Sequence, residues 1–256
     1  TLSDTAHMRP LAPSDLLHDG VLDPELAALL WMLVEGGVPV IVTGDVDSET
    51  RAGLAGALMS MVPDRGWVVL DLDAEPPGAD RLAALLQGGV GLGLSVAAAD
   101  LAGMLDVATG PVGLPEDAVR RLGVVVVAVE RDGSLRCGAV HYLRPTERDG
   151  QGHLQRRPPA VLATWDERDD TYEHYAWGIT PELADRVDRA QADLEERQAD
   201  RAAFLDTLPP AEGVTVTELV RAFLASQPER IPAPVHEPAT PSPFQGGLLD
   251  PDEHSH

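Results

Sequence analysis

The sequence contains no lysine, one cysteine and few aromatic residues. A single cysteine, Cys137, cannot form an intramolecular disulfide, so we expect a reducing cytoplasm. The 19 Lys and Arg positions are all arginine and face 42 acidic residues, which gives a net charge of −23. This charge disfavours binding to nucleic acid and to anionic membrane surfaces. No apolar run reaches the roughly 20 residues that span a bilayer, so we predict no direct membrane insertion.

The 256 residues, 44% of them hydrophobic, suffice for one substantial core and a small appendage. Acidity together with the absence of lysine suits a halophilic organism, because the salt of its cytoplasm screens the repulsion between like charges. Codon bias in a high-GC genome is the alternative explanation of the same composition.

Apolar runs of strand length alternate with helical patterns through the first half of the chain. Helical signals cover 13–35, with one start at Ser14-Asp15 and another at Asp23-Pro24. Strands are predicted at 38–43, 67–72, 92–97 and 123–130, and further helices at 51–61, 80–87, 101–108 and 116–122. Continuous apolar runs are typical of strands covered on both faces, and we expect this of 38–43 and 67–72. Alternating strands and helices predict an α/β fold with a mostly parallel sheet.

The second half has a different character. A hairpin turn at 131–134 leads into a strand at 135–143, and a further strand is expected at 161–165. We predict one long charged helix over 181–208 and a shorter amphipathic helix over 215–225. The resulting domain assignment has three parts. They are a core over 1–177, a helical C-terminal extension over 178–227 and a disordered, Pro-rich acidic tail over 228–256.

Histidines are scattered, and none has the spacing of a metal-binding motif, so we predict no metal site. Cys137 and His141 are four residues apart on a predicted strand. Because side chains alternate between the faces of a strand, we expect both on one face, in a packing role.

Three stretches resemble the motor domain of a known family. The entry segment RPLAPSDLLHDGVLDPELAALLWMLVEGGVPVIVTG and the later stretches WDERDDTY and ADLEERQADRAAFLDTL are similar to conserved patterns of the traffic ATPases of archaeal type II secretion and type IV pilus assembly. The resemblance covers about residues 9–225 and is specific at its two ends. It implies a RecA-like P-loop NTPase core, here reduced by one strand, with a small antiparallel β addition.

The phosphate loop that this resemblance implies is degenerate. In the family the strand is followed by G-x-T-x-S-G-K-T-T. The loop of this chain comprises Gly44, Asp45, Val46, Asp47, Ser48, Glu49, Thr50 and Arg51. Glu49 aligns with a glycine, Thr50 with the lysine and Arg51 with the hydroxyl residue that holds Mg²⁺. Each repulsive charge pair at ~4 Å costs about 4 kcal/mol even at an effective dielectric constant of 20, so we predict that the loop does not bind phosphate.

The other catalytic elements of the family are also altered. Its acidic box after the second strand corresponds here to Asp71, Asp73 and Glu75, which are the only residual catalytic candidates. The G-E-x-R-G segment has no counterpart, and the T-x-H-A motif aligns with Ser95 and Ala97. Four independent losses indicate that nucleotide chemistry is gone.

The resemblance therefore implies a non-catalytic relative that binds or scaffolds in a secretion or pilus system. Its expected partners are an active ATPase paralogue or a membrane platform protein, and its expected location is the cytoplasm, at the periphery of a membrane complex. No cofactor is expected. Two alternatives stay open. One is a divergent NTPase that uses Arg51 and the acidic box with ATP and Mg²⁺, and the other is a small regulatory domain with an unrelated partner.

Overall fold

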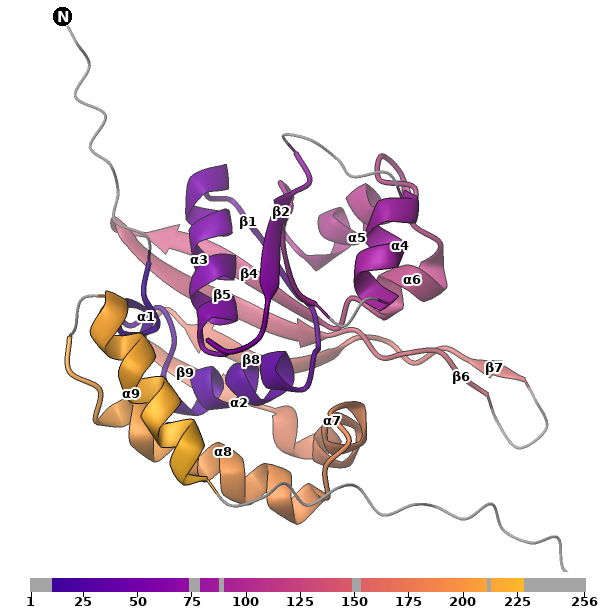
Figure 1. Ribbon diagram of the computed structural model, residues 1–256. Coiled ribbons are helices and arrows are strands. Elements are labelled where there is room, and N and C mark those ends of the chain that lie inside the picture. Colours follow the sequence, from indigo (N-terminus) through magenta and orange to yellow (C-terminus); the bar gives the residue numbers. More distant parts are fainter. Residues whose placement is uncertain (1–10, 74–78, 88–89, 149–152, 211–212, 228–256) are drawn as a thin grey trace, which may run out of the picture.

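The computed structural model describes residues 11–73, 79–87, 90–148, 153–210 and 213–227 (Figure 1). Its main sheet contains seven strands. They are β1 (Val40–Gly44), β2 (Trp67–Asp71), β3 (Gly91–Ser95), β4 (Val124–Arg131), β5 (Ser134–Tyr142), β8 (Ala160–Asp166) and β9 (Thr171–His174). Their order in the sheet is β2-β3-β1-β4-β5-β8-β9. The α/β class predicted from the alternating pattern is confirmed.

The first four strands are parallel and are joined by helical crossovers. The crossover helices are α3 (Ser48–Ser60), α4 (Ala79–Gln87), α5 (Leu101–Thr109) and α6 (Glu116–Arg120). The ends of these strands and helices differ from the predicted ends by at most three residues. The sequence predicted these elements well because the strands are short apolar runs separated by helical stretches.

The other three strands continue the sheet by antiparallel pairing. Since β8 is antiparallel to β5, it points the same way as β4, and five of the seven strands share one direction. The sheet is therefore mostly parallel, as predicted. An additional two-stranded pair, β6 (Glu147–Arg148) with β7 (Leu154–Gln155), extends away from the main sheet (Figure 1). Neither this pair nor β9 was predicted.

Two apolar cores lie on opposite faces of the sheet. On one face, Val40 and Val42 pack with α1 (Pro13–His18), α2 (Pro24–Glu35) and α3. On the other face, Ile41 and Val125 pack with α4, α5 and α6. The 13–35 segment forms two helices, and the second is capped by Asp23, whose carboxylate accepts a hydrogen bond from the Leu26 N–H at 2.8 Å. The continuous apolar character of β1 follows from its burial on both faces.

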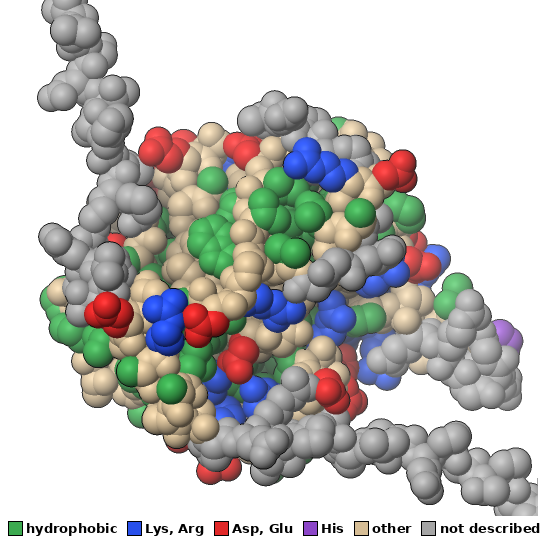
Figure 2. Space-filling view, viewed as in Figure 1, with side chains coloured by type: hydrophobic (Ala, Val, Ile, Leu, Met, Phe, Trp, Pro, Cys, Tyr) green, Lys and Arg blue, Asp and Glu red, His purple; other side chains and the backbone are tan. Residues whose placement is uncertain are grey.

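The predicted burial of β2 is wrong. This strand is the edge of the sheet, and its residues are exposed or half-buried, with Trp67 43% exposed. Figure 2 shows hydrophobic side chains gathered on the surface in the region of α3 and β2. The sequence of β2 resembles a central strand, but the number of neighbours of a strand is decided by tertiary pairing, which local pattern does not report.

The long helix predicted over 181–208 is two helices, α7 (Thr180–Arg186) and α8 (Gln191–Asp206). The helix is interrupted at Asp188, whose φ of 53° lies in the left-handed region. The break brings Val187 against the end of α2, where a Cβ on Gly36 would lie 2.4 Å from the Val187 side chain. No glycine or proline marks the break, so the periodic pattern concealed it.

The helical extension shares a core with the sheet domain. Leu194 and Leu205 of α8 and Val216 and Val220 of α9 (Gly213–Ser226) belong to the same apolar cluster as α2. An aromatic group joins the three helices, with the Phe204 and Phe223 rings stacked at a centroid distance of 4.3 Å. Trp31 of α2 contacts both rings, at 6.1 and 5.6 Å.

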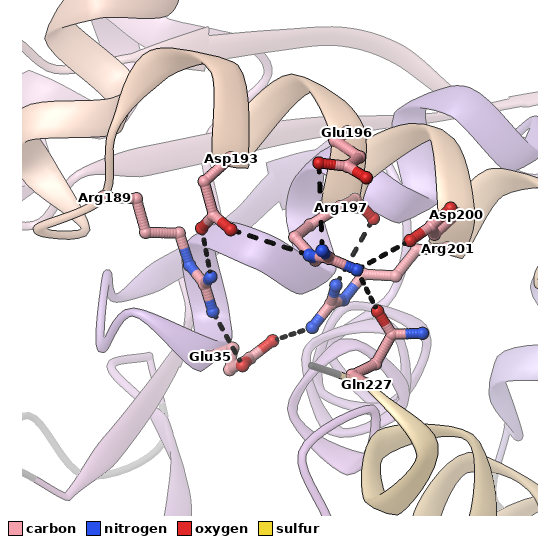
Figure 3. A network of polar contacts seen from close by, with 8 residues as sticks. All are labelled: Glu35, Arg189, Asp193, Glu196, Arg197, Asp200, Arg201 and Gln227. Atoms are coloured by element: carbon pink, nitrogen blue, oxygen red, sulfur yellow. Dashed lines mark hydrogen bonds and ion pairs between the residues drawn. The ribbon is translucent and has the colours of Figure 1, made fainter. Parts of the chain in front are cut away.

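A network of charges also holds α8 in place (Figure 3). Glu35, at the end of α2, bridges Arg189 and Arg201. Asp193, whose side chain is fully buried, bridges Arg189 at 2.6 Å and Arg197 at 3.6 Å. The members closer to solvent are Glu196, Asp200 and Gln227. Residues more than 150 positions apart are thus joined by arginine side chains.

Cys137 and His141 do not share a face of β5, contrary to prediction. The pairing with β4 shifts register between Val127 and Ala128, so that β5 carries a bulge at Gly138. One extra residue reverses the alternation, because the side-chain period of a strand is two. Cys137 therefore lies in the α2 core, while His141 pairs with Val125 of the opposite core.

None of the helices in the described residues is both long and apolar enough to cross a membrane. The tail predicted at 228–256 lies outside the described residues.

Candidate functional site

The most suggestive position for a ligand is the carboxyl end of the parallel strands. β1 and β3 are adjacent, but α3, which follows β1, packs on one face of the sheet and α5, which follows β3, packs on the other. The loops therefore diverge between these two strands. Open α/β sheets bind ligands at such a topological switch point. Here it brings together the ends of β1, β2 and β3, at Gly44, Asp71 and Ser95.

Gly44 is the turn residue that ends β1. Its φ is +130°, and a Cβ at this position would lie 1.9 Å from the Ala128 carbonyl oxygen of β4. Glycine is therefore required by close backbone approach as well as by conformation. The Gly44 N–H and the Thr43 hydroxyl both donate to the Ala98 carbonyl at 2.7 Å. The segment after β3 is thereby fixed to the end of β1.

The N-terminus of α3 is capped by an internal carboxylate. Asp47 accepts hydrogen bonds from the Thr50 N–H and the Thr50 hydroxyl, each at 2.8 Å. These two bonds favour the ionised form and hold the pKa of Asp47 below its usual value. In a phosphate loop these helix N–H groups face the anion. In this chain the Asp47 carboxylate already takes the place of that anion.

Arg51, one turn into α3, lies inside the switch point. The residue is only 6% exposed. Its guanidinium donates to the Val46 carbonyl, forms an ion pair with Asp73 at 2.8 Å and directs Nε to the Ser95 hydroxyl at 3.4 Å. One cation thus connects the β1–α3 loop with the ends of β2 and β3.

Asp73 completes this arrangement from the opposite side. One carboxylate oxygen binds Arg51, and the other accepts the Ala97 N–H at 2.9 Å. The Asp73 N–H in turn donates to the Asp71 carboxylate at 3.0 Å. The predicted acidic box is therefore engaged with the protein's own groups. Glu75, its third member, lies outside the described residues.

The remaining loop residues face solvent. Asp45, Ser48 and Glu49 are exposed, and Thr50 and Val46 are half-buried. Three carboxylates, those of Asp45, Asp47 and Glu49, therefore lie on the outer surface of the loop, while its only cation points inward to Asp73. No group of three or more potential metal ligands is found among the described residues.

The sequence located this site but not its internal contacts. The sequence offers Arg51 as a nucleotide ligand and Asp73 as part of a residual catalytic box, whereas the structure pairs the two with each other. Ser95 and Ala97, aligned with a lost catalytic motif, contact the same pair. The only signal in the sequence for these contacts was the position of Arg51. It lies on the apolar side of a helix that follows a strand, where a charged side chain needs a buried partner.

No known family model matches this sequence, and no curated protein is significantly similar to it.

Proposed function

We propose that this protein is a non-catalytic relative of the traffic ATPases of type II secretion and type IV pilus systems, with a RecA-like core that has lost one strand. It acts as a binding or scaffolding partner of an active ATPase paralogue or of a membrane platform protein. The motifs at the two ends of the sequence support the relationship. The parallel strands with their crossovers, and the strand, glycine turn and helix around Gly44, agree with it.

The observation that carries the loss of catalysis is the internal occupation of the switch point. Arg51 and Asp73 neutralise each other where a ligand phosphate and its cation would lie, and Asp47 caps the helix. A triphosphate would have to displace the Asp47 cap and the Asp73 ion pair against two further exposed carboxylates, Asp45 and Glu49. Displacing charge-assisted hydrogen bonds costs about 1.5–3 kcal/mol each.

The alternative of a divergent NTPase needs a free Arg51 guanidinium. Its nitrogens are directed to Val46, Asp73 and Ser95, and its residue is buried. Arg51 therefore has a structural role that accounts for its presence without a nucleotide.

Calorimetry with Mg-ATP at high salt tests the loss of nucleotide binding. We expect no binding heat from the native chain or from the Arg51→Ala variant. Micromolar binding by the native chain that disappears in Arg51→Ala would establish the divergent NTPase instead. Circular dichroism of the variant shows whether it is folded.

Co-purification from native cells tests the partner. A tagged chain should recover a secretion or pilus ATPase with intact catalytic motifs, or a platform protein. Recovery of the chain alone, under conditions in which such ATPases are expressed, would contradict the scaffold role even if ATP binding is absent.

A further inference from the structure

A concave site lies beside β9, which is the edge strand at the far end of the sheet from β2. It is a cavity of about 250 Å³ between the end of β9, the short 3₁₀ helix η1 (Ala176–Ile179), α7, and the N-terminal halves of α2 and α8. Leu29, Leu183 and Leu194 supply its apolar wall. Polar groups converge on it from the same elements.

Trp177 is the most exposed large hydrophobic side chain among the described residues. It lines the cavity and is 80% exposed, whereas Trp31 in the helical core is fully buried. Its neighbour Tyr175 is 40% exposed. Exposed tryptophan beside a cavity is unusual on a monomeric surface and marks a contact site, because tryptophan is enriched at the centres of binding interfaces.

The charges around the cavity are mainly negative. Glu25 of α2 and Glu195 of α8 line it, and both are exposed at its rim. The Glu195 carboxylate is positioned by a 2.8 Å hydrogen bond from the Gln191 side chain. None of the described residues that line the cavity is an arginine, although the chain has 19.

His174 forms the inner polar wall and is held by a carboxylate. Its Nε2 lies 2.8 Å from Asp23 and 3.9 Å from Glu25. The hydrogen bond to Asp23 raises the pKa of His174. Asp23 also caps α2 through the Leu26 N–H, so the positive end of this helix is already satisfied and does not create an anion site.

We propose that this cavity binds an arginine side chain presented by a partner protein. A guanidinium can stack on the exposed Trp177 ring while its N–H groups reach the carboxylates of Glu25 and Glu195. Planar stacking combined with two-pronged carboxylate contacts is the binding mode that arginine uses better than lysine. Complementarity of charge supports a cationic ligand on a chain with a net charge of −23.

The probe for this proposal is a blocked tripeptide, acetyl-Gly-Arg-Gly-amide, titrated into the ¹⁵N-labelled full chain. The reporter is the indole N–H resonance of Trp177, assigned by its disappearance in Trp177→Phe. We expect this resonance to shift with a millimolar dissociation constant. The same peptide with citrulline, which keeps the shape but lacks the charge, should bind at least tenfold more weakly. The lysine peptide should lie between the two.

Variants separate this site from the rest of the surface. Trp177→Ala should weaken binding of the arginine peptide at least tenfold, and Glu25→Gln combined with Glu195→Gln should weaken it severalfold and reduce its salt dependence. Trp67→Ala, which removes an exposed tryptophan on β2, is the matched control and should leave the affinity unchanged. For Trp177→Ala, the reporters are the Thr180 and Gln198 amides, because both residues line the cavity.

Three outcomes would overturn the proposal. They are equal or tighter binding of acetyl-Gly-Glu-Gly-amide, an arginine affinity that survives Trp177→Ala, and no change at Trp177 up to the solubility limit of the arginine peptide. None of these outcomes bears on the secretion-system proposal. That proposal rests on the switch point between β1 and β3 and is tested by nucleotide and by co-purification.

Discussion

Among the residues that the structure describes, arginine is buried at two places, and these two places accommodate the cation differently. At the carboxyl end of the parallel strands, Arg51 shares its donors among a carbonyl, a hydroxyl and the single carboxylate of Asp73. Between α2 and α8, by contrast, three arginines divide the carboxylates of Glu35 and Asp193 (Figure 3). The charge of Arg51 is therefore balanced by one carboxylate, whereas the three arginines between α2 and α8 share two carboxylates.

Sharing has a consequence for stability. Asp193 is fully buried, so its loss would leave two arginines without a common counter-ion. Asp73 retains 29% side-chain exposure, and water can replace part of what it supplies to Arg51. Polar satisfaction is also less complete in the α8 network, where Nε of Arg197 and Arg201 and one Asp193 oxygen have no hydrogen bond within the described structure. The network should therefore be the more fragile of the two.

The largest effect is expected for Asp193→Ala. Removing one partner of a buried ion pair typically costs about 3–5 kcal/mol, because the remaining charge is stranded away from water. The free energy of unfolding, measured by denaturant titration, should fall by this amount. Asp200→Ala is the matched control, since Asp200 pairs with Arg197 but is 44% exposed, and it should cost less than about 1 kcal/mol. Equal losses would show that Asp193 is not the centre of the network.

A smaller effect, about 2 kcal/mol, is expected for Asp73→Ala, because a partly exposed acceptor of a charged donor is lost. A double-mutant cycle with Arg51→Met separates the pair from its surroundings. We expect a coupling free energy of about 1 kcal/mol or more between the two positions. Additive effects would indicate that Arg51 is held mainly by Val46 and Ser95, and the comparison with the α8 network would then fail.

The smallest effect is expected for Asp47→Ala at the α3 cap, about 1 kcal/mol at neutral pH. Because hydrogen bonds from Thr50 lower the folded-state pKa of Asp47, the contribution of its charge is present above the unfolded-state pKa of about 3.9 and is lost as pH falls through the folded-state value. The difference in unfolding free energy between native chain and variant should thus narrow below about pH 4. Asp45→Ala removes an equal charge from the same loop without removing the cap of α3, so at neutral pH it should cost less than Asp47→Ala.

Much of the fold was predictable because its elements are marked by local features of the sequence. β1 and α3 follow from an apolar run, a turn glycine and a helical stretch that lie within about twenty residues of each other. Three features were not predictable in this way. The edge position of β2 depends on its pairing partners, the break at Asp188 on a left-handed aspartate, and the face of His141 on a bulge that adds one residue.

For the candidate site, too, local features were predictable and long-range contacts were not. Its position was predicted from the strand, Gly44 and helix, since these are contiguous. Its chemistry was not, because the partners of Arg51 are 22 and 44 residues away in sequence, at Asp73 and Ser95. The Trp177 cavity was not predicted from the sequence for a similar reason, because its walls come from five separate elements. The resemblance to the traffic ATPases was drawn from motifs and stays a proposal.

The bulge at Gly138 also has a practical consequence. By turning Cys137 inward, it buries the only thiol of the chain, and burial raises the pKa of that thiol. The Cys137 N–H is bound to the Val21 carbonyl and to the Tyr172 hydroxyl, so the thiol lies where β5 meets the loop before α2. A thiol-reactive dye should therefore label the folded chain only as fast as this junction opens. The labelling rate of this natural cysteine thus reports the rate at which the junction opens, without any engineered label.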